Sequence, residues 1–308
     1  MSGFTITAGV SFSGGFTFTE APPPLENTAA WFGGGLPGPV STVQRITFAT
    51  DTATASIRGP LSSARHYLAA AGNTSDGWFG GAYPNFSTVD RITYATDTAT
   101  ASVRGPLSSA RYVLAAAGNT SDAWFGGGAP GPMSTVDRIT YATDTNTASV
   151  RGPLSLARRY LAAAGNDTDA WFGGGGNGPG YKSTVDRITY ATDTATASVR
   201  GPLSSARLYL AAAGNTTDGW FGGGNGSSRV DRITYATDTD TASVRGPLSV
   251  ARQGLAAAGN SDYGWFGGGY PPNSTVDRIT YATDTATASV RGPLSSARYA
   301  LAAVGGIQ

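Results

Sequence analysis

Short hydrophobic segments alternate with clusters of turn-forming residues along most of this chain, and the pattern repeats. In one representative copy, four such segments follow one another at residues 67–71, 78–81, 87–96 and 100–104. The third segment is rich in β-branched residues and Tyr, which favours a strand. Asn, Asp and Gly fill the intervening clusters, as is typical of tight turns, and Gly105-Pro106 ends the last segment because proline cannot continue a β-ladder. Each copy therefore predicts four antiparallel strands.

The copies recur at a nearly constant interval that is marked by tryptophan. The chain contains six of these residues, spaced 45–49 residues apart: Trp31, Trp78, Trp124, Trp171, Trp220 and Trp265. A repeat of about 40–50 residues that carries four strands is the unit of a β-propeller. The sequence thus predicts an all-β fold in which residues 27–308 form six four-stranded blades, with the Ala-rich segment of each blade nearest to the crowded axis.

The two ends of the repeat region complement each other. The first copy begins near residue 27 and lacks the Ala-rich segment, whereas residues 301–305 supply an additional one after the sixth copy. We expect this C-terminal strand to complete the first blade. Such pairing closes the ring and removes the open sheet edge that would otherwise remain in blade one.

Arg and Asp recur at fixed positions in every copy. Both faces of a propeller blade pack against neighbours, so charged side chains on the central strands need partners. We therefore expect networks of Arg–Asp ion pairs between blades, because the planar guanidinium suits carboxylates better than the Lys ammonium does. In the first copy Gln44 stands where the others carry Asp, which predicts a weaker junction there.

Three features of each copy are similar to those of kelch-type repeats. In the second copy they are the glycine pair Gly80-Gly81, Tyr94 before a turn, and Arg65 before the innermost strand. The outer strand lacks the tryptophan that this family usually carries there, and the tryptophan lies before the glycines instead. The resemblance covers residues 27–308 and implies a propeller fold, but a fold does not define a function.

The first 26 residues do not belong to the repeat. Hydrophobic side chains alternate with Thr and Ser in this segment, which is the period of a β-strand, and Pro22-Pro23-Pro24 forms a stiff spacer. We expect residues 1–26 to be a β-type docking arm that adds a strand to another protein's sheet. The alternative is a tail that folds back onto the propeller or stays disordered. The expected anchoring residues are Phe4, Ile6, Val10, Phe12, Phe16 and Phe18.

Composition and charge exclude several classes of function. The formal net charge is +1, which gives no electrostatic basis for binding nucleic acid. No hydrophobic run is long enough for membrane insertion, and the N-terminal segment lacks the basic and continuous hydrophobic regions of a secretory signal peptide. The chain has no Cys, and His66 and Lys182 are the only residues of their types.

This narrow set of side chains also argues against an enzyme. Glycoside hydrolysis usually uses a pair of carboxylates, but the repeats contain no Glu. Kelch-type copper oxidases need Cys, His and Tyr ligands. A calcium loop needs more acidic groups than Asp76, the single carboxylate in the turn at residues 73–77. We therefore expect no catalytic residue, no metal and no cofactor.

The copies differ mainly in two places: the loop after the glycine pair, and the two residues that follow the Arg before the Ala-rich strand. Both places lie at the same end of a four-stranded antiparallel blade, so the variable residues should share one rim. Tyr is frequent among them, as in antibody paratopes, which favours a binding surface over simple drift of exposed loops. The expected ligand-binding rim comprises His66, Tyr67, Tyr83, Phe86, Tyr112, Arg159, Tyr160, Tyr181, Lys182, Tyr209, Arg229, Tyr270 and Tyr299.

The near-identical copies, which read STVDRITYATDTATASVRGPLSSAR at residues 87–111 and 183–207, resemble repeat proteins encoded by tailed bacteriophages. The resemblance implies a virion protein made in the host cytoplasm. Its expected partners are another virion protein, through residues 1–26, and a bacterial surface glycan or protein, through the rim. The alternative is a capsid or tail decoration or scaffold protein that has no ligand of its own.

Overall fold

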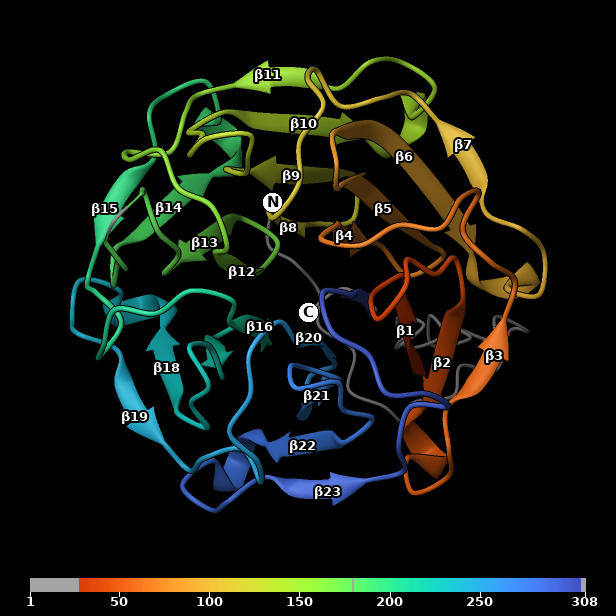
Figure 1. Ribbon diagram of the computed structural model, residues 1–308. Helices are drawn as coiled ribbons and strands as arrows, with labels where there is room; N and C mark the ends of the chain where they lie inside the picture. The colour runs from red at the N-terminus through yellow and green to blue at the C-terminus, as the bar shows by residue number, and fades with distance from the viewer. Residues whose placement is uncertain (1–27, 179, 306–308) are drawn as a thin grey trace, which may run out of the picture.

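The computed structural model describes residues 28–178 and 180–305, which form six four-stranded antiparallel sheets arranged as the blades of a ring (Figure 1). The six-bladed propeller expected from the sequence is thereby confirmed. The docking-arm prediction concerns residues 1–26, which lie outside the described residues.

Each blade adds its strands outward from the axis. The innermost strands are β24 (Ala302–Val304), β4 (Ala69–Gly72), β8 (Ala115–Gly118), β12 (Ala162–Gly165), β16 (Ala211–Gly214) and β20 (Ala256–Gly259). The second strands are β1 (Ala29–Gly33), β5 (Asp76–Ala82), β9 (Asp122–Gly126), β13 (Asp169–Gly173), β17 (Asp218–Gly222) and β21 (Tyr263–Gly267). The third strands are β2 (Val43–Thr47), β6 (Phe86–Thr93), β10 (Val136–Thr140), β14 (Val185–Thr189), β18 (Val230–Thr234) and β22 (Val276–Thr280). The outermost strands are β3 (Ser56–Arg58), β7 (Ser102–Arg104), β11 (Ser149–Arg151), β15 (Ser198–Arg200), β19 (Ser243–Arg245) and β23 (Ser289–Arg291).

Blade one is built from both ends of the repeat region. Strand β24 pairs antiparallel with β1, placing Val304 opposite Trp31 and Ala302 opposite Gly33. The blade therefore has the order β24-β1-β2-β3, and the C-terminal strand covers the edge that β1 would otherwise expose. Closure of the ring by this strand is confirmed.

Two predicted strands are shorter than the hydrophobic pattern suggests. The innermost strand of blade two begins at Ala69, because Tyr67 has a φ of 58° and lies outside the extended region. The third strand ends at Thr93, and Tyr94–Thr96 form a short 3-10 helix, η2, instead of continuing it. The reason lies in the preceding blade, since the Tyr94 ring stacks on Trp31 with centroids 3.9 Å apart.

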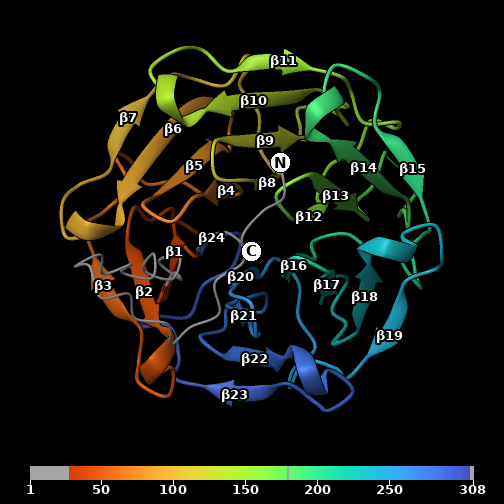
Figure 2. The ribbon, with the colours of Figure 1, turned by 180° about the vertical axis from the view of Figure 1, so that it is seen from behind.

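The same helix recurs in every blade: η1 (Phe48–Thr50), η3 (Tyr141–Thr143), η4 (Tyr190–Thr192), η5 (Tyr235–Thr237) and η6 (Tyr281–Thr283). These helices share one end of the ring with the turn between the first two strands of each blade, because the Tyr94 N–H donates to the Ser75 carbonyl (2.9 Å). The loop between the second and third strands lies at the opposite end. Figures 1 and 2 show the ring from its two ends.

The hydrophobic core lies between neighbouring blades rather than within one sheet. At the junction of blades two and three, Trp78 stacks on Tyr141 with ring centroids 3.8 Å apart. The Trp78 indole N–H donates to Asp144 Oδ2 (2.9 Å), and Arg91 donates to the same oxygen (3.1 Å). Equivalent contacts recur at the other junctions, with Phe48 in place of Tyr where blade six meets blade one. The expected inter-blade Arg–Asp networks are confirmed.

The glycine pair of each repeat lets the blades approach closely. A Cβ on Gly80 would lie 2.8 Å from a ring carbon of Phe125 in the next blade, which is closer than packed atoms tolerate. The small residue therefore makes room for the aromatic ring, and the same contact recurs around the propeller.

A second set of ion pairs ties each linker to the blade that it enters. Arg111, which precedes β8, pairs with Asp137 on β10 of the same blade (2.8 Å), and both side chains are fully buried. Ser108 donates its N–H to Asp137 (2.9 Å), and Arg111 donates to the Thr135 carbonyl (2.8 Å). These pairs lie within a blade, so they do not belong to the inter-blade networks.

Blade one lacks the carboxylate of this second pair. Gln44 accepts a hydrogen bond from the Ser295 N–H (2.6 Å), and Arg298 donates to the carbonyls of Gly34 (3.1 Å) and Thr42 (3.0 Å). Desolvation, with no acidic partner to offset it, lowers the pKa of Arg298 to about 10. The replacement of Asp by Gln44 therefore leaves Arg298 buried with only neutral hydrogen-bond acceptors.

Candidate binding face

The two variable sets of residues meet at one end of the propeller, which we call the tyrosine face. It consists of the linker pairs at 66–67, 112–113, 159–160, 208–209, 253–254 and 299–300, and the described residues of the loops at 36–40, 82–86, 129–133, 176–178, 180–182, 225–229 and 270–273. Linker and loop contact each other directly: Tyr112 pairs with Ala129, and Gln253 pairs with Tyr270, as isolated β-bridges. Both variable sets therefore lie at the same end of the propeller, as expected from the sequence.

A closed ring of backbone hydrogen bonds surrounds the axis at this face. The second residue of each linker pair donates its N–H to the carbonyl of its counterpart in the preceding blade, over distances of 2.7–3.0 Å. The ring runs from Tyr67 to Ala300, Gly254, Tyr209, Tyr160, Val113 and back to Tyr67. These bonds hold the blades at a fixed spacing, so the side chains that they carry are positioned relative to one another.

Every residue of this ring has a left-handed backbone, with φ between 51° and 65°. Only Gly254 is a glycine, and such a conformation costs other residues about 1–2 kcal/mol each. The left-handed conformation turns each N–H toward the neighbouring blade. The hydrogen bond that this N–H makes there offsets the strain and completes the ring. The five side chains of the ring residues line the hollow at the mouth of the axis.

Three tyrosines cluster at this mouth. The rings of Tyr160 and Tyr209 have centroids 4.0 Å apart, and Tyr67 lies 6.2 Å from Tyr160 and 6.4 Å from Tyr209. Burial raises the pKa of Tyr67 and of Tyr209, and a hydrogen bond between the Tyr209 and Tyr160 hydroxyls adds to the effect on Tyr209. Both shifts favour the neutral form of the Tyr67 and Tyr209 phenols. Six buried leucines form the floor: Leu68, Leu114, Leu161, Leu210, Leu255 and Leu301.

A second aromatic group extends this cluster over blades two and three. The His66 ring lies 5.2 Å from both Tyr67 and Tyr83, and Tyr83 meets Tyr112 edge to face at 5.2 Å. His66 is only 8% exposed, and desolvation lowers the pKa of its imidazole. The structure therefore makes His66 a neutral packing residue of the cluster, while Tyr83 remains exposed.

On the other side of the axis, Tyr270 and Tyr299 form an edge-to-face pair with centroids 5.2 Å apart. A hollow of about 220 Å³ lies beside them, lined by Tyr67, Tyr209, Gln253, Gly254, Tyr270 and Tyr299. Four of the tyrosines singled out from the sequence thus surround one cavity. This cavity adjoins the leucine-floored hollow at the axis, since Tyr67, Tyr209 and Gly254 line both.

The remaining candidate residues lie farther from the axis. Tyr181 is 57% exposed and Phe86 is 40% exposed, and neither ring contacts another aromatic ring within the part of the chain that the structure describes. Arg159 lies over the ring of Tyr160, with its guanidinium 5.4 Å from the centroid. Arg229 donates to Ser204 Oγ (3.0 Å), and Lys182 is half-buried in the loop of blade four.

Reasoning from the sequence missed four residues that shape this face. Val113, Gly254 and Ala300 carry the ring of hydrogen bonds, and Gln253 lines the hollow. All four belong to the variable pairs, so the alignment of the repeats marks their positions. Their left-handed backbone could not be predicted from the sequence. Gly and Asn are the residues that usually adopt this conformation, and five of the six ring residues are neither.

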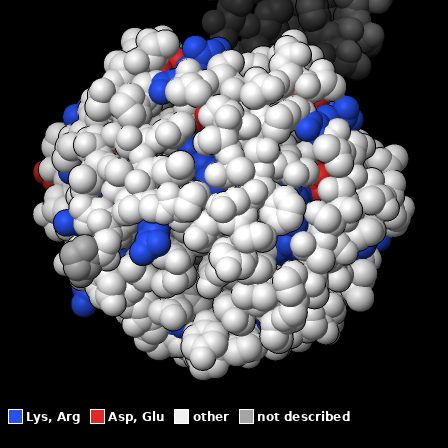
Figure 3. Space-filling view, turned by 45° about the horizontal axis from the view of Figure 1, so that its top comes forward, with Lys and Arg blue, Asp and Glu red and all other residues white. Residues whose placement is uncertain are grey.

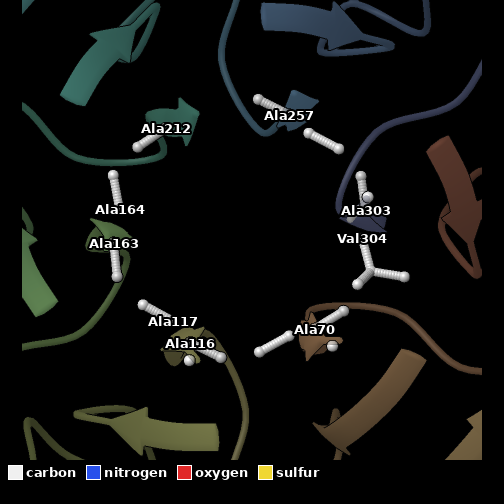
Figure 4. Close-up of a pocket in the computed structure, with 15 residues that line it drawn as sticks. Ala70, Ala116, Ala117, Ala163, Ala164, Ala212, Ala257, Ala303 and Val304 are labelled. Atoms are coloured by element: carbon white, nitrogen blue, oxygen red, sulfur yellow. The ribbon is translucent and has the colours of Figure 1, made fainter. Parts of the chain in front are cut away.

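The opposite mouth of the axis offers no chemistry of its own. It is lined by the innermost strands, whose alanines surround the opening, as Figure 4 shows. All of its lining residues are Ala, Gly or Val. Over residues 28–178 and 180–305, no cluster of three or more His, Cys, Asp or Glu could hold a metal ion. The same residues include no helix with the length and hydrophobicity needed to cross a membrane.

Comparisons with known proteins identify the fold. No protein-family model matches the chain, and no curated protein matches it in sequence. A solved structure titled "Structure of YjhT" is similar, with a TM-score of 0.64 and 11% sequence identity, over 78% of this chain and 87% of that one. At such low identity the similarity shows the architecture alone. The class that the fold defines is therefore the six-bladed β-propeller, and the similarity to kelch and bacteriophage repeats stays an expectation.

Proposed function

We propose that the protein is a non-enzymatic virion protein that recognises the host-cell surface through its tyrosine face and is anchored by residues 1–26. The observation that carries the recognition role is the tyrosine face itself. Otherwise nearly identical repeats differ there, and their differing side chains converge into one aromatic cluster beside a hollow. If the loops had merely drifted, no such convergence would be expected.

The composition of the face supports binding rather than catalysis. Tyr supplies a large contact area at a low cost in conformational entropy, and the backbone ring holds several of these side chains in place before a ligand arrives. No Asp or Glu belongs to the tyrosine face, and His66 is buried and neutral. A general acid and base within reach of each other are therefore missing from this surface.

The virion role is supported by the similarity of the repeats to bacteriophage repeat proteins and by the strand-like pattern of residues 1–26. Mass spectrometry of purified particles should detect the chain at stoichiometric levels. A chain that lacks residues 1–26 should be absent from particles, although it still folds. Particles without the full-length chain would contradict the virion role.

Recognition is tested by the binding of the fluorescently labelled full chain to a panel of bacterial surfaces. In one variant, all six loops of the tyrosine face carry the sequence of a single repeat. In a matched control, the turns at the opposite end are made uniform instead. We expect selective binding that the first variant loses and the control retains. Equal binding by all three proteins, or binding to no surface, would contradict recognition and favour a decoration role.

A further inference from the structure

One position of the axial ring carries no side chain. Gly254 in blade six occupies the place that Tyr67, Tyr160 and Tyr209 fill in three other blades, and Ala300 is the next residue of the ring. The backbone is continuous there, because the Gly254 N–H donates to the Tyr209 carbonyl (2.8 Å) and the Gly254 carbonyl accepts from Ala300 (2.7 Å). The hollow therefore lies beside a ring position that keeps its backbone contacts but has no side chain.

Aromatic rings enclose this hollow from two sides. Tyr67 and Tyr209 line it toward the axis, and the edge-to-face pair of Tyr270 and Tyr299 lines it toward the periphery. Gln253 completes the wall, and its side-chain amide makes no hydrogen bond with any described residue. A ligand in the hollow would therefore meet the side chains of four tyrosines and one primary amide.

The hollow carries no charge. Its lining includes no Asp, Glu, Lys, Arg or His, and burial raises the pKa of Tyr67 and of Tyr209 above the usual value of a phenol. Arg159, Lys182 and Arg229, the charged residues of this face, belong to blades four and five. In Figure 3 the Lys and Arg side chains are scattered over a largely uncharged surface. An ionic ligand would lose hydration in the hollow without gaining an opposite charge.

The geometry points to a subsite for one residue of a neutral saccharide. This inference rests on the proposed function, since it names what the tyrosine face binds. A pyranose ring has an apolar C–H face that packs against aromatic rings, and its hydroxyls pair with amide and phenol groups. Aromatic walls with a few polar groups are the usual composition of a small-ligand site, and the opening at Gly254 gives the site its size.

The chain itself offers a variant that fills the subsite without disturbing the fold. A Cβ at position 254 would lie 3.6 Å from the nearest atom, the Ala300 nitrogen, which is ordinary contact. The φ of Gly254 is 65°, and Tyr160 adopts 60° at the equivalent position. We therefore expect Gly254→Tyr to fold and to occupy the hollow, whereas Gly254→Ala should fold and leave most of it open.

The test is binding of the labelled full chain to an array of immobilised glycans that end in neutral hexoses or N-acetylhexosamines, with glycans ending in sialic or uronic acids alongside. We expect the wild type to bind neutral termini and Gly254→Tyr to weaken that binding at least about tenfold, whereas Gly254→Ala should change it by less than about threefold. Gln253→Ala should weaken binding without abolishing it. Thermal unfolding of each variant establishes that it is folded.

Three results would overturn the subsite: no binding to any glycan, binding to acidic termini only, or equal binding by the wild type and Gly254→Tyr. Whole bacterial cells separate this failure from failure of the proposed function. If cells bind the wild type and Gly254→Tyr equally, the tyrosine face recognises something other than a saccharide in the hollow. If cells bind neither protein, recognition itself is refuted.

Discussion

At the scale of single residues, the buried arginine that precedes the innermost strand of each blade forms an ion pair in five blades and lacks its acidic partner in blade one. Five of them pair with an Asp on the third strand of their own blade, whereas Arg298 faces Gln44 and has only neutral acceptors. Desolvation lowers the pKa of all six, and the Asp partner opposes this effect in five. Arg298 is therefore the one of these six arginines whose desolvation no carboxylate offsets.

Gln44→Asp should restore this ion pair and stabilise the protein. A hydrogen bond to a charged group contributes roughly 1–3 kcal/mol, so the free energy of unfolding measured in urea should rise by about that amount. Because the folded-state pKa of Arg298 is depressed to about 10, the wild-type penalty is complete below pH 10 and is relieved as the pH rises toward the unfolded value. The advantage of the variant should shrink accordingly above pH 10.

The reciprocal substitution in blade three provides the control. Asp137→Asn removes the carboxylate and leaves Arg111 buried and unpaired, which should cost roughly 3–5 kcal/mol. If Gln44→Asp destabilises the protein, or if Asp137→Asn has no effect, the buried pairs do not contribute as described.

Residue identities at the candidate site could be predicted from the sequence, but their contacts could not. Comparison of the repeats singled out Tyr67, Tyr209, Tyr270 and Tyr299, and all four line the hollow. Their separations in the chain say nothing about which rings meet, because this depends on the diameter of the ring and on a left-handed backbone that the residue types conceal. His66 was expected on the rim, yet it is buried, since neighbouring rings cover it.

At the scale of elements, the junction between blades is the unit of stability. Each junction combines a stacked aromatic pair, an indole hydrogen bond and arginines that share one carboxylate, as Asp144 does for Trp78, Arg91 and Arg104. The strand order and closure could be predicted because they follow from hydrophobic pattern and repeat phase. The 3-10 helices could not, because the Tyr or Phe that starts each one stacks on a tryptophan in the preceding blade.

Alkaline titration reports directly on these junctions. Burial raises the pKa of Tyr141, Tyr190, Tyr235 and Tyr281 above its usual range. The protonated phenol is thus favoured by folding, so this contribution to stability is complete below pH 10 and is lost as the pH rises above it. Phenolate absorbance at these residues should therefore appear only together with loss of near-ultraviolet circular dichroism.

Tyr141→Phe tests the assignment, since Phe48 occupies the same position in blade one. The hydroxyl of Tyr141 is buried without a hydrogen-bond partner among the described residues, so its removal should not destabilise the protein and should raise the free energy of unfolding by up to about 1–3 kcal/mol. The phenolate absorbance that appears only when the protein unfolds at high pH should be smaller in this variant, because one buried tyrosine is missing. Ionisation of all tyrosines near pH 10 in an intact fold would contradict the buried junctions.

At the scale of the whole molecule, closure through β24 should hold the ring together. Deletion of residues 301–308 removes this strand and exposes the edge of β1, which invites pairing with other chains. We expect the melting temperature to fall by roughly 10 °C or more, with larger species detected by light scattering.

Deletion of residues 306–308 alone leaves β24 in place and serves as the matched control. It should melt as the wild type does. If the longer deletion also left the melting temperature and the size of the protein unchanged, the terminal strand would not be what closes the ring.

The whole molecule combines a nearly uniform scaffold with variation at one end, and the central claim is that this end contacts the host. Hydrogen exchange of the full chain, measured with and without envelope fragments from bacteria that bind it, tests this claim most directly. We expect slower exchange in residues 82–86, 253–254, 270–273 and 299–300, and no change in the turn at 73–77. Protection at that turn instead, or no protection anywhere, would contradict recognition through the tyrosine face.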